Sequence, residues 1–320
     1  MEERVIAVPN AAAVRQASSF LSGPDWRLYP GTATISFHPS YCHMQPWALA
    51  ALAAWALEFR RVGGEFKVEN AARAQYGWRL GLASYLGIKS PMQVTEHEES
   101  GRFVPLRTIK TSDDLAELLA NLVTLLHLSA EPEIAKAVQY AMSEIVRNTL
   151  EHSKSRYGAV VAAQLYAGKA SPRRYVSIAV ADAGIGVRAT IQRNYKVESH
   201  SDALLKAIQP GVSGSSHELY GSSDNAGAGL FITRRVAAAT QRYFLIASGD
   251  AMFRTSIAKE KPRDERLVDP ISFFPGTIVS VEVGLQESAD FSEILSLARE
   301  AFGGKMHQRR GDLSRRVRFT

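Results

Sequence analysis

The sequence predicts an α+β protein whose larger part is a two-layer α/β sandwich, with helices on one face of a mixed, mostly antiparallel sheet. The chain has 320 residues, of which 46% are hydrophobic, so it can bury a sizeable core and fill two domains. Apolar residues recur at helical spacing in 113–127 and 131–152. Short alternating runs follow at 158–166, 175–181 and 277–283 and are typical of strands, so packing the helices on one face of a sheet is the economical outcome.

A small α/β domain is predicted for residues 1–101. An alanine-rich helix should be stopped by Gly63-Gly64, and a second helix by Gly87. The expected strands are 27–29, 33–37 and 65–69, and the expected helices are 46–62 and 71–86.

Residues 102–286 form the second predicted domain. A connector, 88–110, should end in an edge strand, and Thr111-Ser112 should cap the helix that follows. Beyond the elements already given, we expect a loop or lid at 187–224, a helix at 227–240, and strands at 243–247 and 252–257. Residues 287–320 are expected to hold one amphipathic helix, at about 291–302, and a basic tail.

The bulk properties limit the class of protein. A net charge of +6 and a pI near 9.4 suit an anionic partner but do not identify nucleic acid. The single cysteine, Cys42, excludes an intramolecular disulfide, and the N-terminus has no signal-peptide pattern, so the cytoplasm is the expected location. The most apolar run, 46–58, is too short to span a bilayer, and no membrane association is predicted.

One polar stripe stands out in the predicted helix 131–152. Glu144, Asn148 and His152 follow one another at intervals of four residues and therefore share one side of the helix. Met142, Ile145 and Val146 provide an apolar face beside it, so the helix can pack on a core while presenting the stripe to a cavity.

Three further motifs follow in the chain. Asp182-Ala-Gly184-Ile-Gly186 ends a strand, Gly227-Ala228-Gly229-Leu230 opens a helix, and Thr277 begins the last strand. A buried Asp182 needs a hydrogen-bond donor, and backbone N–H groups at a helix start favour phosphate. In this order the four segments, over residues 103–285, resemble the boxes of the GHKL ATPase superfamily of gyrase, Hsp90-type chaperones, histidine kinases and MutL.

The resemblance implies a Bergerat-type ATP-binding fold, with ATP and Mg²⁺ as cofactors. It makes Asn148 the magnesium ligand, Glu144 the group that accepts a proton from the attacking water or hydroxyl, and Asp182 and Thr277 the contacts to adenine. Gly184 and Gly186 would let the turn pass close to the base. Residues 227–230 would hold the phosphates, and His152 would either reach them or support the helix.

The segment Ser143 to His152 looks most like the corresponding box of anti-sigma-factor serine kinases, and the first domain distantly resembles STAS-type domains. This implies slow ATP hydrolysis, or phosphorylation of Ser or Thr on a protein partner of the STAS or sigma-factor type, with a homodimer as one possible assembly. Ser40 is the nearest candidate for a STAS-type phosphoacceptor. The residues alone do not separate hydrolysis from transfer.

Several alternatives stay open. The chain could be a nucleotide-gated interaction module with incidental turnover. Gly184 to Ala189 imitates a dinucleotide fingerprint, with Glu198 downstream, which would suit an NAD-binding enzyme. Nucleic-acid remodelling would need a transducer domain, for which too little chain follows residue 285.

Isolated residues offer weaker signals. His38, Cys42 and His43 invite a zinc interpretation but lack a convincing fourth ligand. His127 lies on the predicted helix 113–127 and is expected to be a core or interface residue rather than a phosphoacceptor. Cations that lie near enough in sequence to aid phosphate binding are Lys206, Arg234 and Arg235.

Overall fold

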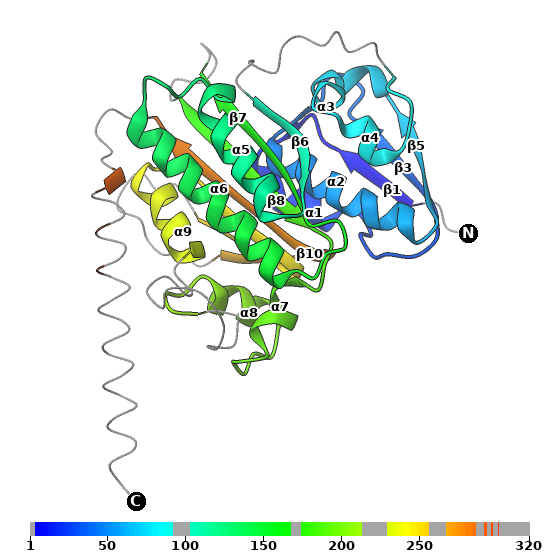
Figure 1. Ribbon diagram of the computed structural model, residues 1–320. Coiled ribbons are helices and arrows are strands. Elements are labelled where there is room, and N and C mark those ends of the chain that lie inside the picture. Colours follow the sequence, from blue (N-terminus) through cyan, green and yellow to red (C-terminus); the bar gives the residue numbers. More distant parts are fainter. Residues whose placement is uncertain are drawn as a thin grey trace, which may run out of the picture.

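The computed structural model describes residues 4–91, 103–167, 174–212, 229–255 and 267–285, together with Phe291, Ser292, Ser296 and Glu300. Its central element is a five-stranded sheet in which every neighbouring pair is antiparallel. The strands, in spatial order, are β6 (Phe103–Ile109), β7 (Ala159–Tyr166), β8 (Tyr175–Asp182), β10 (Leu267–Gly284) and β9 (Phe244–Arg254) (Figure 1). The predicted edge strand is confirmed as β6, at one margin of the sheet.

Three helices cover one face of this sheet: α5 (Ser112–Leu125), α6 (Pro132–His152) and α9 (Gly229–Ala239) (Figure 1). Alternation along β8 turns Ile178 and Val180 toward them, and Met142 and Ile145 of α6 belong to the same apolar cluster. Thr111 caps α5 through a capping box with Asp114. The predicted layer of helices on a mostly antiparallel sheet is therefore confirmed.

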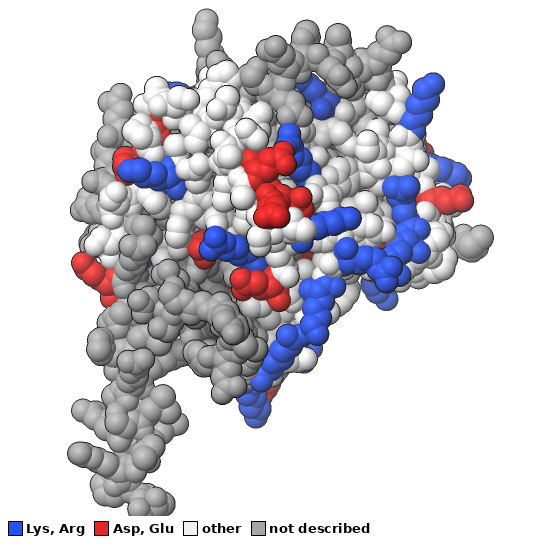
Figure 2. Space-filling model, in the orientation of Figure 1, with Lys and Arg blue, Asp and Glu red and all other residues white. Residues whose placement is uncertain are grey.

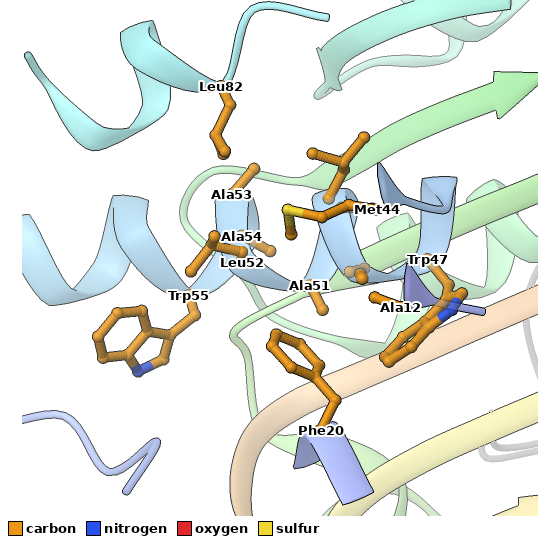
Figure 3. Packing of buried hydrophobic residues seen from close by; sticks show 14 of the residues in the cluster. Ala12, Phe20, Met44, Trp47, Ala51, Leu52, Ala53, Ala54, Trp55 and Leu82 are labelled. Carbon is orange, nitrogen blue, oxygen red and sulfur yellow. The ribbon is translucent and has the colours of Figure 1, made fainter. Parts of the chain in front are cut away.

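The opposite face of the sheet is covered by α2 (Pro46–Arg61), so the predicted two-layer sandwich has a further layer. Small side chains meet here and let helix and sheet approach closely: Ala50, Ala51, Ala53 and Ala54 on α2, and Ala162, Ala179, Ala181 and Ala247 on the sheet. Larger side chains fill the flanks. Figure 3 shows Phe20 directed toward Ala51 and Trp47 of α2, and the two rings are 5.6 Å apart.

The N-terminal region is an α/β unit, as expected. Its parallel sheet has the order β1 (Arg4–Val8), β3 (Gly31–Phe37), β5 (Gly64–Glu69), and α2 lies between this sheet and the larger one. A single apolar cluster joins both sides of α2. The smaller elements are β2 (Ala11–Ala12), β4 (His43–Met44), α1 (Ala17–Ser22), α3 (Gln75–Arg79), α4 (Leu82–Leu86) and 3₁₀ turns at Val14–Gln16 and Ala71–Arg73.

Two predictions in this region are wrong. No strand forms at 27–29, because Asp25 accepts hydrogen bonds from the backbone N–H of Arg27 and from the hydroxyl of Tyr29, which holds a local turn. The first strand is β1 instead. The single helix expected at 71–86 is broken, since Gly81 takes a φ of +90° between α3 and α4.

Three further differences lie in the second half of the chain. The expected loop at 187–224 contains α7 (Gly186–Ile191) and α8 (His200–Ala207) within its described part. The two strands expected at 243–257 are one strand, β9, because Gly249, with a φ of +62°, lies in a bulge against β10 rather than in a turn. Helix α5 ends before His127, which is exposed in a left-handed turn rather than buried.

Most of the predicted tail, 287–320, lies outside the described residues. Phe291 is buried and packs against Tyr140 of α6. No helix in the described ranges is long and apolar enough to cross a bilayer.

Candidate functional site

The polar stripe of α6 begins against α9. Glu144 is half-buried, and a methyl group on Gly229 would come within 2.3 Å of its Oε2 atom, so the start of α9 passes directly over the Glu144 carboxylate. Burial raises the pKa of Glu144, while the charge of Arg147 opposes this shift. Two of the predicted segments therefore meet at the Glu144 carboxylate.

The other end of α6 is tied to the loop that follows β8. The backbone carbonyl of Ser153 accepts a hydrogen bond from the N–H of Ile185 at 2.8 Å, and the carbonyl of His152 accepts one from the Thr190 hydroxyl at 3.4 Å. Asn148 lies one turn before His152 and is half-buried. The stripe thus runs from the first turn of α9 to the loop 183–186 that follows β8, which we call the glycine loop.

Asp182 ends β8 as a buried carboxylate. Its Oδ1 atom accepts a hydrogen bond from the N–H of Gly184 at 2.8 Å, and the backbone N–H of Thr277 also donates to it. Burial nevertheless raises the pKa of Asp182 to about 7. Thr277 faces Asp182 across the β8–β10 pair, so these two predicted base contacts lie side by side.

Glycine is required in the loop because other chain segments approach it closely. A Cβ on Gly184 would lie 2.1 Å from the Ser153 carbonyl oxygen. Gly186 has a φ of +75° and Gly276 one of +87°, and a Cβ on Gly276 would lie 2.2 Å from the Asp182 carbonyl oxygen. Close packing against neighbouring backbone therefore requires glycine at Gly184 and Gly276, whereas the expected passage of the turn close to a base stays a prediction. Gly276 opens the predicted last strand, but this packing role was not foreseen from the sequence.

Ser248 is a second residue that sequence reasoning missed. Its hydroxyl donates to the Gly276 carbonyl at 2.7 Å and accepts from the Val187 N–H at 2.9 Å, so it joins β9, β10 and α7. A buried serine inside a strand, just before Gly249, was the available signal.

The remaining predicted residues are those expected to hold phosphate or to aid its binding. Gly227 and Ala228 lie outside the described residues, while Leu230 is partly buried against the cluster beneath α9. The Lys206 ammonium lies 4.9 Å from the centre of the Tyr195 ring, the Arg234 guanidinium lies over Phe231, and Arg235 is exposed.

His152 is mostly buried and lies at the C-terminal end of the stripe. Burial lowers the pKa of His152, Glu151 opposes this shift and Arg193 adds to it. The imidazole is therefore favoured in its neutral form, which can both donate and accept a hydrogen bond.

Helix α8 is fastened to β9 beside this site. Ser199 and Asp202 form its capping box, and the His200 Nδ1 atom lies 2.8 Å from Asp250 Oδ1. The His200 ring also packs edge-on against the exposed Phe273 of β10, at 5.8 Å. The described part of the expected lid thus contains α7 and α8, and α8 is held by the His200–Asp250 contact, the ring contact with Phe273 and its own buried residues Ala203, Leu204 and Ala207.

The three residues of the zinc interpretation, His38, Cys42 and His43, contact other groups of the protein. The Cys42 thiol donates to the Pro9 carbonyl, and burial raises its pKa to about 11. His43 packs against Tyr76 and Tyr166, and His38 accepts the Ser40 N–H. Among the residues that the structure describes, no three His, Cys, Asp or Glu side chains gather as metal ligands.

Comparison with protein-family models, with curated proteins and with solved structures finds no match to this chain. We define the candidate site by the residues Glu144, Asn148, His152, Asp182, Gly184, Gly186, Gly229 and Thr277.

Proposed function

We propose that the protein binds ATP with Mg²⁺ at the candidate site and transfers the γ-phosphoryl group to water or to a Ser or Thr hydroxyl of a protein partner. The observation that carries this proposal is the buried Asp182 carboxylate beside Thr277, on the loop that is hydrogen-bonded to the end of α6. Asp182 already accepts the backbone N–H groups of Gly184 and Thr277, and an ionised carboxylate has further lone pairs that the exocyclic amine of adenine could fill as a donor.

The residues present fit both cofactors. A Cβ on Gly184 would meet the Ser153 carbonyl oxygen at 2.1 Å, and one on Gly186 would meet the Ser248 hydroxyl at 2.8 Å, so these glycines hold the loop after Asp182 close to the end of α6 and to β9. Asn148 offers one amide oxygen on the same stripe as Glu144, and Mg²⁺ is commonly held by one or two protein oxygens with phosphates and waters.

When bound, Mg²⁺ would supply positive charge that stabilises the phosphate oxygens. The role of Glu144 follows from its own environment. Because burial raises its pKa, the ionised Glu144 carboxylate is a better proton acceptor than an exposed glutamate and could take the proton of the attacking hydroxyl on Oε2. The first turn of α9, over Glu144, would hold the phosphates through backbone N–H groups.

The proposal is tested by incubating the pure protein with γ-labelled ATP and Mg²⁺ and following released phosphate and protein-bound label separately. Glu144→Gln should lose turnover by about 100-fold or more while retaining ATP binding, since general-base catalysis contributes about 10²–10⁴-fold. Glu117→Gln is the matched control, because Glu117 is exposed on the neighbouring helix α5. Equal turnover in wild type and Glu144→Gln would remove Glu144 from the mechanism.

A nucleotide-gated interaction module is the second candidate. The observation that favours it is the attachment of α8 to β9 and to the exposed Phe273, since a bound nucleotide could change the position of α8 and thereby a partner surface. In that case Asn148→Ala should uncouple partner binding from ATP, whereas Glu144→Gln should leave it intact.

The NAD-binding alternative fits the geometry less well. A dinucleotide-binding unit needs parallel strands joined by a helix, whereas β8 is antiparallel to both of its neighbours. The six-residue helix α7 leads to α8, and Glu198 precedes that helix instead of ending a strand. A binding assay that compares ATP with NAD separates the two.

A further inference from the structure

Exposed cations from four separate segments gather on one face of the molecule. Figure 2 shows Lys and Arg side chains in a band that runs from the α7 end, past the C-terminal end of α6, to α2. We call this the basic band and define it by five exposed residues: Arg61, Lys110, Lys154, Arg156 and Arg193.

Contacts between the segments hold the band together. A Cβ on Gly158 would lie 3.1 Å from the Cα of Lys110, so the chain before α5 touches the loop between α6 and β7. The Thr190 hydroxyl of α7 donates to the His152 carbonyl at 3.4 Å, which places Arg193, just past α7, beside the end of α6. The band is therefore a product of the fold and not of a basic run in the sequence.

The charge of the band is only partly neutralised. Arg61 pairs with Glu58, whereas Lys154 and Arg156 form no salt bridge within the described ranges. Acidic side chains, Asp113 and Glu117, are exposed at the start of α5, close to Lys110 in the chain. The surface thus combines the positive charge of the band with negative charge at Glu151, beside the end of α6, and at the start of α5.

We propose that the basic band is the docking surface for an acidic segment of a protein partner, the molecule that carries the acceptor hydroxyl. This inference rests on the proposed function. The band ends at Arg193, beside His152 of the candidate site, so a segment lying along it would bring neighbouring residues of the partner to that site. A nucleic acid has uniform negative charge and would be repelled by Asp113 and Glu117, whereas a protein surface can match both signs.

The test measures fluorescence anisotropy of a labelled peptide of alternating Glu and Ser residues, with a single-stranded DNA oligonucleotide of equal charge as the competing probe. Wild type is compared with Lys154→Glu/Arg156→Glu. The matched control is Arg15→Glu/Arg73→Glu, which makes the same charge change at exposed positions of the N-terminal region. Calorimetric titration with ATP is run on every variant.

In Lys154→Glu/Arg156→Glu, two side chains that attract the acidic peptide become two that repel it. Peptide affinity should therefore fall by about tenfold or more in this variant and by less than about threefold in the control. Binding should also weaken at high salt. Equal losses in both double variants, or no peptide binding by wild type, would overturn the proposal. Tighter binding of the DNA, weakened by the same band variant, would overturn it in favour of a nucleic-acid surface.

The two proposals fail separately. ATP affinity should be unchanged in the band variant, because Lys154 and Arg156 lie outside the candidate site. Selective peptide binding by a protein that does not bind ATP would refute the nucleotide site and with it the acceptor role of the peptide, while the surface itself would stand. ATP binding without selective peptide binding would refute only the docking role of the basic band.

Discussion

Replacing Asp182 by asparagine tests the base-binding role of this carboxyl group against its effect on stability. The structure contains two buried carboxyl groups whose pKa burial raises to about 7: Asp182, at the candidate site, and Glu282, on the far part of β10. Asp182→Asn and Glu282→Gln each remove one of them without a large change of volume. Both variants should therefore change the pH dependence of stability in the same way, but only Asp182→Asn changes the candidate site.

The expected magnitude follows from linkage. The folded pKa of each group is raised above its unfolded value of 3.8 or 4.5, so the folded state holds the proton more tightly. The free energy of unfolding therefore falls as pH rises from the unfolded pKa through about 7. As the pH rises from about 5.5 to about 8.5, each group should lower the free energy of unfolding by about 2 kcal/mol. Wild type, which has both groups, should lose about 4 kcal/mol.

Urea denaturation at these two pH values, followed by circular dichroism, measures the effect. Each single variant should lose about half of the wild-type pH dependence, since an amide does not ionise. ATP titration at neutral pH should then separate them: Asp182→Asn should bind at least about tenfold more weakly, and Glu282→Gln should bind like wild type. Equal ATP affinity in the two variants would refute the reasoning that assigns the adenine contact to Asp182.

Three other substitutions test the remaining contacts. Gly229→Ala should displace the Glu144 carboxylate, whose Oε2 atom would lie 2.3 Å from the new methyl group, and lower turnover by about tenfold, measured as released phosphate, with only a small change in melting temperature. Asn148→Ala should raise the Mg²⁺ concentration needed for ATP binding, measured by titration of the metal; an unchanged requirement would show that another group holds it. His200→Ala should free α8 from Asp250 and speed hydrogen exchange in residues 200–207, while exchange in α6 stays as in wild type.

The sequence predicted those parts of the fold that local pattern determines. The capping box at Thr111, the 3.6-residue period of α6 and the alternation in β8 identify their elements without tertiary information. The spacing of Glu144, Asn148 and His152 likewise gave one stripe, which the helix confirms. Binding of ATP and Mg²⁺ there stays a proposal.

The sequence could not predict features that depend on long-range packing. The alanine-rich helix α2 was expected, but its position between two sheets follows from small residues on strands more than 100 positions away. Gly249 resembles a turn residue, yet pairing with β10 continues through it as a bulge. Ser248 and Gly276 acquire their roles only when β9 and β10 meet the glycine loop.

The central claim is that α6 and the loop after β8 enclose one purine nucleotide. Photo-crosslinking with 8-azido-ATP and Mg²⁺, followed by peptide mapping, tests it most directly because the reactive group is on the base. We predict labelled peptides that contain residues 182–186 or 276–277, with labelling suppressed by excess ATP and by Asp182→Asn. Suppressible labelling confined to the N-terminal sheet, or to any surface that lacks Asp182 and Thr277, would contradict the account.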